Sequence, residues 1–146
     1  MLTGNLDVPA DHKSLEKIIS WSHNINLEII DIISKDSLDI DDNDRQLLVD
    51  TIQTIKNENI IIIHGTDTID QSAQYLKKQI NNKKVVLTGA MIPMSIDQTE
   101  ATLNFSMAIG FLNADPKNDI YLSMHGAVQE ANKIVKDKKQ GKFLIR

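Results

Sequence analysis

The sequence contains no cysteine, which excludes disulfide scaffolds, cysteine-ligated zinc, iron–sulfur clusters and thiol catalysis. It also lacks linkers rich in proline, glycine and serine, internal repeats and low-complexity tracts, so nothing divides its 146 residues into separate units. No apolar run approaches the roughly 18 residues of a membrane helix, and the first residues do not resemble a signal peptide. We therefore expect a soluble, cytoplasmic protein with a single domain over residues 1–146.

Strong positive charge and metal-ligand spacing are absent as well. The formal net charge of −4 argues against nucleic acid as a partner. Aspartates crowd residues 36–44, but a calcium loop starting at Asp39 would need glycine where Asp44 stands and glutamate where Asp50 stands. The four histidines also lack metal-ligand spacing, so we expect no bound metal.

Short runs of isoleucine and valine alternate along the chain with amphipathic stretches. The runs are apolar on both faces, which is typical of strands buried in a parallel sheet. The stretches between them carry apolar residues three and four positions apart, as amphipathic helices do. The predicted strands span residues 27–33, 60–63, 85–87 and 120–124, and the predicted helices span 12–22, 44–56, 70–80 and 99–113. This order predicts a doubly wound, mainly parallel α/β sheet with helices on both faces.

Small polar residues gather directly after the predicted strands, where open α/β sheets bind their ligands. They form the segments 36–39 (Asp-Ser-Leu-Asp), 64–68 (His-Gly-Thr-Asp-Thr) and 88–93 (Thr-Gly-Ala-Met-Ile-Pro). Taken singly, each also fits a structural role, such as a helix cap or a plain turn. His64 and His125 both precede glycine at a strand end, and either a catalytic or a hydrogen-bonded structural role is open for them.

Together and in this order, these segments resemble the asparaginase/glutaminase family over roughly residues 26–143. Segment 64–68 is similar to the family's second signature, in which a threonine and an aspartate act on the amide substrate. Segment 88–93 resembles the adjoining small-residue motif, and 35–39 resembles the segment whose serine binds the substrate's α-carboxylate. Several lysines lie near the end of the chain, and Lys136 is the one that falls where the family places its catalytic lysine. The likeness is closest to short, single-domain asparaginase-like proteins.

The resemblance implies a flavodoxin-like domain that hydrolyses the side-chain amide of asparagine, or of a similar small amide, to aspartate and ammonia. It implies three catalytic residues, Thr66, Asp67 and Lys136. The residues it implies for substrate binding are Ser37, Asp39, Gly65, Thr88 and Ala90. No cofactor is expected. The expected partners are a small amino-acid or amide substrate and further copies of the chain, in a homodimer or homotetramer, but no membrane.

The start of the chain departs from the family pattern. The family opens with a strand and a T-G-G-T-I segment, whose last threonine is usually the primary nucleophile. This chain has Thr3-Gly4-Asn5-Leu6, with leucine near the nucleophile position, and we expect the first strand to be missing. In a flavodoxin-like order that strand lies inside the sheet, so its loss would leave two rows of backbone groups unpaired.

Three explanations for this departure are open at the level of sequence. The chain is an N-terminally shortened fragment or has a misassigned start, a partner chain supplies the strand, or the protein is a degenerate member that binds aspartate or asparagine without turnover. A phosphate-binding domain fits less well, because the chain has neither G-x-x-x-x-G-K-[ST] nor G-x-G-x-x-G and carries acids at the strand ends.

Overall fold

The computed structural model describes residues 2–5 and 12–146, with side chains from residue 15 onward. Six strands form one sheet in the order β2-β1-β3-β4-β5-β6, in which neighbours are parallel except for the antiparallel pair β5 and β6. Their bounds are β1 Leu2–Asn5, β2 Glu28–Ile30, β3 Asn59–Ile63, β4 Lys84–Thr88, β5 Asp119–Met124 and β6 Ala127–Glu130. A separate antiparallel hairpin follows, with β7 at Ile134–Asp137 and β8 at Lys142–Ile145.

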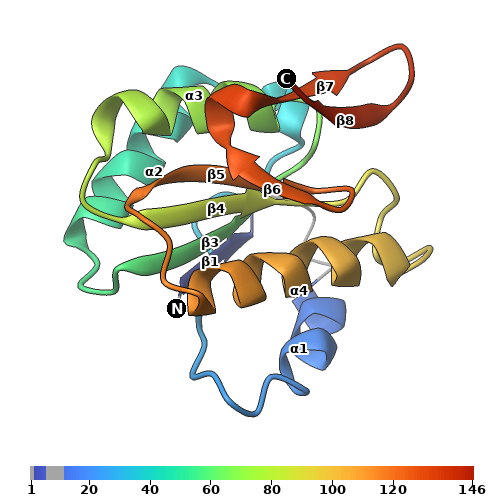
Figure 1. Cartoon of the computed structure of the whole chain (residues 1–146), viewed down its shortest axis with the longest axis horizontal. Coiled ribbons are helices and arrows are strands. Elements are labelled where there is room, and N and C mark those ends of the chain that lie inside the picture. The colour runs from blue at the N-terminus through green and yellow to red at the C-terminus, as the bar shows by residue number, and fades with distance from the viewer. Residues whose placement is uncertain (1, 6–11) are drawn as a thin grey trace.

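Helices cover the sheet on both sides (Figure 1). Helices α2 and α3 lie on one face, and α1 and α4 lie on the other. The α-helices are α1 His12–Ile19, α2 Asp42–Thr54, α3 Ile69–Gln79 and α4 Thr99–Asn113, and the short 3-10 helices are η2 Ser37–Asp39 and η3 Ala131–Lys133. The predicted doubly wound α/β architecture is therefore confirmed, although β2 and α1 are shorter than predicted.

The expectation that the first strand is missing is wrong. Residues Leu2–Asn5 form β1, which pairs in parallel with β2 on one side and β3 on the other. Its register places Asn5 opposite Ile63, the last residue of β3. Because β2 and β3 both supply backbone partners to Gly4, and β3 supplies one to Asn5, even these residues with weak strand preference can complete the ladder. The interior of the sheet is filled by this chain alone.

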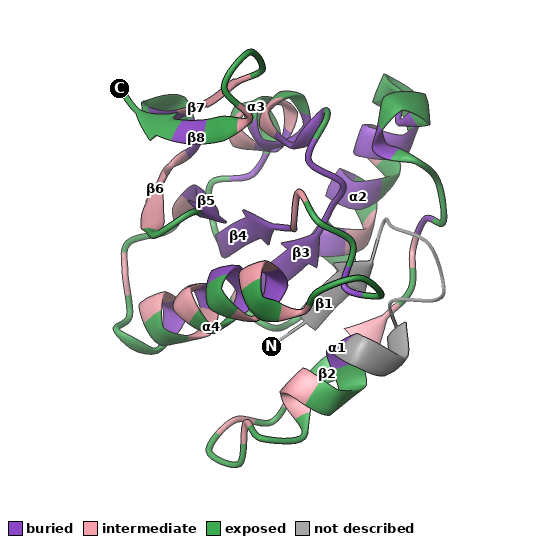
Figure 2. Cartoon of the chain, turned by 90° about the vertical axis from the view of Figure 1, so that its right-hand side faces the viewer, coloured by how far each residue is buried: buried purple, intermediate pink, exposed green. Residues whose placement is uncertain are grey.

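Strand β3 shows how the core is divided. Successive side chains of a strand point to opposite faces of the sheet. Ile60 and Ile62 accordingly belong to the core cluster under α2 and α3, and Ile61 and Ile63 belong to the cluster under α1 and α4. All four side chains are buried, which explains why this segment is apolar at every position. Figure 2 shows β3 and β4 buried between the two helical layers.

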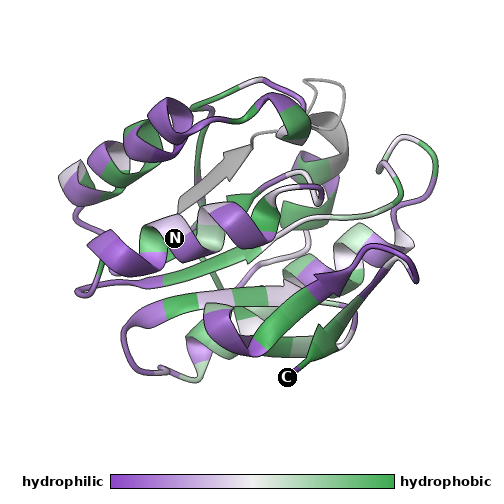
Figure 3. Ribbon diagram, turned by 90° about the horizontal axis from the view of Figure 1, so that it is seen from above, coloured by the Kyte–Doolittle hydropathy of each residue, from purple (hydrophilic) through white to green (hydrophobic). Residues whose placement is uncertain are grey.

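The hairpin and the η3 turn before it pack beside α3 at the edge of the sheet. Ile134 and Phe143 pack into the core cluster under α2 and α3, and the Gln74 side chain on α3 donates to the carbonyl oxygen of Ala131 at 2.9 Å. Viewed from above, the strands are largely hydrophobic and the helices carry hydrophilic stripes (Figure 3). Within residues 2–5 and 12–146, no helix is both long and apolar enough to cross a membrane.

Candidate functional site

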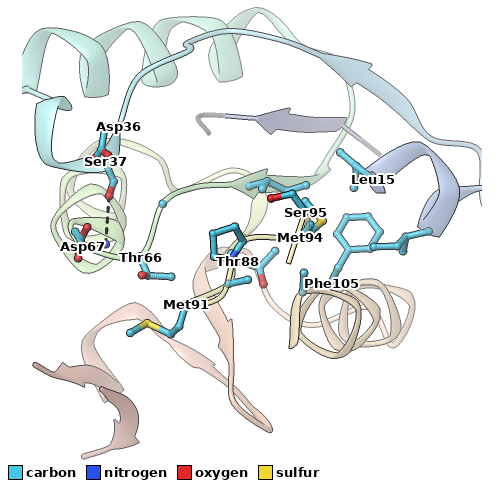
Figure 4. A pocket seen from close by; sticks show the side chains of 17 residues that line it. Leu15, Asp36, Ser37, Thr66, Asp67, Thr88, Met91, Met94, Ser95 and Phe105 are labelled. Atoms are coloured by element: carbon cyan, nitrogen blue, oxygen red, sulfur yellow. Dashed lines mark hydrogen bonds between the residues drawn. The ribbon is translucent and has the colours of Figure 1, made fainter. Parts of the chain in front are cut away.

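A cavity of about 420 Å³ opens at the edge of the sheet where β3 and β4 end (Figure 4). Its walls come from the loops after these two strands, from η2, and from α1 and α4. This is where ligands bind in open α/β sheets, and the sequence segments 64–68 and 88–93 both contribute to the lining. Of the predicted substrate-binding residues, Ser37, Gly65, Thr88 and Ala90 line the cavity, whereas the exposed Asp39 does not. Asp36, three positions before Asp39, does line the cavity.

The three predicted catalytic residues lie together. The Nζ atom of Lys136 is 3.1 Å from the carbonyl oxygen of Thr66, 3.3 Å from its Oγ1, and 3.3 Å from Oδ1 of Asp67. Thr66 and Asp67 line the cavity, whereas Lys136, whose side chain is only 5% exposed, contacts them without lining it. Since Thr66 Oγ1 accepts from Lys136, its own proton can be offered to a molecule in the cavity.

Ser37 joins η2 to the loop that carries Thr66 and Asp67. Its hydroxyl oxygen accepts from the backbone N–H of Asp67 at 3.3 Å, and its carbonyl oxygen accepts from the Thr68 hydroxyl at 2.6 Å. Because the Ser37 hydroxyl acts here as an acceptor, its proton is left for another partner. The side chain is buried but lines the cavity, so a small anion there can receive that hydrogen bond.

Thr88 has the opposite polarity. Its hydroxyl donates to the carbonyl oxygen of Ser123 at 2.8 Å, and a hydroxyl has only one proton to donate. The Thr88 oxygen can therefore only accept from a ligand, as the N–H of an amide requires. A carboxylate oxygen at the same place would find no donor in this side chain.

Close backbone contact joins the loops after β3 and β4. A Cβ atom on Gly89 would overlap the carbonyl oxygen of His64, so only glycine fits at this position. The side chain of Asn104 on α4 donates to the Gly89 carbonyl oxygen at 2.8 Å and accepts from the backbone N–H of His125 at 3.0 Å. Asn104 was missed in the sequence, where one signal was available: a polar residue between the apolar Leu103 and Phe105 in a helix.

His64 has a hydrogen-bonded structural role. Its Nδ1 lies 2.6 Å from the carbonyl oxygen of Gly65, which can only accept, so Nδ1 carries the proton. Nε2 then accepts from the Ser72 hydroxyl at 2.8 Å, and the Ser72 oxygen accepts from Nε of Arg45 at 3.0 Å. Burial lowers the pKa of His64 to about 4 and keeps the ring neutral, which matches this chain of donors and acceptors. Sequence reasoning missed both Ser72 and Arg45.

His125 ties the β5–β6 turn to α4. Its Nε2 is 2.6 Å from Oε2 of Glu100, and it adopts a left-handed backbone conformation with φ 53°. Burial acts to raise the pKa of Glu100, but hydrogen bonds from the backbone N–H groups of Ile92 and Met91 and from His125 outweigh it and leave that pKa lowered. This pair braces the loop after β4.

In the part of the chain that the structure describes, no group of three or more histidine and acidic residues is arranged to hold a metal ion.

The sequence matches one family model and resembles known L-asparaginases. The sequence model of the family described as "Asparaginase, N-terminal" matches residues 3–142. L-asparaginase 1 of Escherichia coli K12 is 27% identical over 105 residues, which are 69% of this chain and 31% of that protein. The chain thus covers less than a third of the length of this curated relative.

Two solved structures share the architecture. The thermostable L-asparaginase from Thermococcus kodakarensis superposes with a TM-score of 0.83 at 21% identity, over 99% of this chain and 51% of that one. A probable cytoplasmic L-asparaginase from Campylobacter jejuni gives a TM-score of 0.82 at 21% identity, over 97% and 49% of the two chains. At these identities the likeness establishes the fold.

Proposed function

The chain belongs to the family of the asparaginase N-terminal domain, and on this premise we propose that it hydrolyses the side-chain amide of asparagine or a similar small amide. The observation that carries the proposal is the contact of Lys136 with both Thr66 and Asp67. These residues stand about 70 positions apart in the chain, yet the hairpin places the amine within 3.3 Å of a hydroxyl that faces a ligand-sized cavity.

The proposed substrate position follows from the polarity of the groups. The Ser37 hydroxyl donates to the α-carboxylate of the substrate, and the half-exposed carboxylate of Asp67 receives its α-ammonium. The side-chain amide then lies near Thr88, whose oxygen accepts an amide N–H, and near the backbone of Gly65 and Ala90. No cofactor takes part in this arrangement.

The proposed reaction uses Thr66 as the nucleophile. A threonine hydroxyl is weak alone and needs a neighbouring base. Lys136 Nζ, 3.3 Å from Thr66 Oγ1, fills this role as an uncharged amine, when the hydrogen bond between them reverses and Thr66 donates. As Thr66 Oγ1 bonds to the amide carbon, its proton passes to Lys136 and then to the departing nitrogen, and the C–N bond breaks. Ammonia leaves, an aspartyl ester remains on Thr66, and water hydrolyses it to aspartate.

Release of ammonia from asparagine tests this proposal. Thr66→Ala removes the nucleophile and is expected to lower the rate by at least a hundredfold. Thr54→Ala is the matched control, since Thr54 lies exposed at the end of α2, and it should retain the full rate. An unchanged rate in Thr66→Ala would disprove the assigned role.

A second candidate function is binding of aspartate or asparagine without hydrolysis. It is favoured by the leucine near the position where the family's primary threonine is expected, Leu6, which lies outside the residues that the structure describes. The two functions differ in one experiment. Thermal stabilisation by millimolar aspartate with no ammonia release from asparagine would support binding alone, and no shift at all would count against it.

Two broader expectations stay predictions. Association into a homodimer or homotetramer was expected partly from an incomplete sheet, a reason that no longer applies because β1 completes it. Light scattering at micromolar concentration tests it, and a monomer would contradict it. A cytoplasmic location is also proposed, supported by the description of the Campylobacter jejuni relative as a cytoplasmic L-asparaginase.

A further inference from the structure

The cavity has two ends of different chemistry. One end carries Ser37 and the carboxylates of Asp36 and Asp67, from η2 and the loop after β3. The other carries Leu15 of α1 and Phe105 of α4. Figure 4 shows these two groups on opposite sides of the cavity, with Thr88 between them. A ligand held by its charged groups at the first end therefore points its remainder toward the second.

The apolar end is a built part of the core. Leu15, Phe105 and Ile63 belong to one buried cluster under α1 and α4, and Ala101 extends this wall. Both charged side chains among the described lining residues, Asp36 and Asp67, lie at the opposite end. Ser95 lies between Thr88 and this end (Figure 4), but Leu15, Ala101 and Phe105 themselves offer water no polar side-chain group. Displacement of water from these three side chains by an apolar group is favourable.

The volume exceeds what asparagine needs. Pockets of roughly 300–1,000 Å³ commonly hold drug-sized ligands, and the 420 Å³ of this cavity lies within that range. Asparagine is a much smaller molecule. Once its charged groups are held near Ser37 and Asp67, it leaves the apolar end unfilled.

We propose that the preferred substrate is an asparagine whose amide nitrogen carries an apolar group, which occupies the end lined by Leu15, Ala101 and Phe105. This inference rests on the proposed function. Such an amide keeps one N–H, which suits the accepting oxygen of Thr88. Hydrolysis breaks the same C–N bond as in asparagine. The nitrogen takes the proton that came from Thr66 and leaves as an apolar amine, and water releases aspartate from the enzyme.

A series of N-substituted asparagines tests the proposal on the whole chain. Methyl, propyl and benzyl groups on the amide nitrogen should raise affinity in that order, and the benzyl compound should bind at least tenfold more tightly than asparagine. Asparagine hydroxamate, with one N–H and a polar hydroxyl, is the matched polar ligand and should bind no more tightly than asparagine. Equal affinity across the series, or weaker binding of the benzyl compound, would overturn the inference.

A substitution in the apolar wall localises the effect. Ala101→Leu adds bulk there and should raise the dissociation constant of the benzyl compound at least tenfold more than that of asparagine. Ser106→Leu places the same side chain on the exposed side of α4 and should leave both constants unchanged. If Ala101→Leu fails to fold, the ligand series on the unaltered chain still tests whether an apolar group on the amide nitrogen raises affinity.

The two proposals fail in different ways. Hydrolysis of asparagine with no preference for the apolar derivatives would overturn this inference and leave the proposed function standing. Tight binding of the benzyl compound, with no benzylamine released from it and no ammonia released from asparagine, would support the apolar subsite and overturn the proposed hydrolysis. Ammonia and benzylamine are measured in the same reaction mixtures, so both outcomes are visible at once.

Discussion

His64 should make the folded state lose stability between pH 6.5 and pH 4. Burial lowers its pKa from an ordinary 6.5 to about 4, and the hydrogen bond to the Gly65 carbonyl oxygen offsets only part of that shift. Between these values the unfolded chain binds a proton that the folded chain does not. The free energy of unfolding therefore falls as the pH drops through this window. At about 1.4 kcal/mol per unit of pKa, the loss is about 3 kcal/mol.

The structure explains why a second proton on the His64 ring destabilises the folded state. Nε2 accepts from the Ser72 hydroxyl, whose oxygen already accepts from the buried Arg45. A proton on Nε2 would break this bond and place a second positive charge beside the guanidinium. Carboxylates such as that of Glu100, whose pKa is lowered, act in the same direction, but only at a lower pH.

Urea unfolding between pH 7 and pH 4 measures this effect. His64→Gln keeps an acceptor for Ser72 but cannot titrate, so its stability should fall less steeply than that of the unaltered chain, by about 1.4 kcal/mol per pH unit. His23→Gln, at an exposed position, is the control and should keep the original slope. Parallel curves for His64→Gln and the unaltered chain would refute the reasoning, as would an imidazole resonance of His64 that titrates near pH 6.5.

Further predictions concern the packing of loops and helices. Gly89→Ala should destabilise the fold by about 1–3 kcal/mol in thermal unfolding, because the new Cβ overlaps the backbone of His64. Gly110→Ala, within α4 and with open space around it, should instead stabilise it by about 0.5–1 kcal/mol, and a loss of stability there would contradict the packing. Asp44→Ala, which removes half of a capping box with Asp41, should cost about 1 kcal/mol in urea unfolding, and no change would argue against the cap.

Lys136 offers a test of the polar end of the cavity. Lys136→Met should abolish ammonia release, because it removes the base at Thr66. Lys133→Met is the matched control and should keep its activity, since the half-exposed Lys133 of η3 pairs with Glu130 at 3.3 Å. Equal activity in the two variants would contradict the proposed reaction.

Most of the architecture followed from local patterns. The isoleucine run at 60–63 is buried on both faces of the sheet, and the helix predicted at 99–113 has those bounds in the structure. Strand β1 could not be predicted in this way, because Gly4 and Asn5 favour turns over strands. Its place depends on backbone pairing with β2 and β3, which no local pattern records.

Some residues of the candidate site could be predicted from the sequence, and others could not. Ordered motifs pointed to Ser37, Thr66 and Thr88, because strand ends meet at one edge of the sheet. Lys136 came from family resemblance alone, since only the folded hairpin brings it to Thr66. The supporting polar residues Ser72, Asn104 and Ser123 are fully buried, and nothing in their local sequence distinguishes them from ordinary surface positions except the apolar setting of Asn104.

The central claim is that Thr66 is the nucleophile of an amide hydrolysis. The most direct measurement is peptide mass spectrometry after the chain is mixed with asparagine and quenched rapidly in acid. An aspartyl ester on the peptide that contains Thr66, absent from Thr66→Ala, is the predicted result. Ammonia release with no ester at Thr66, or with the ester on another residue, would contradict the claim.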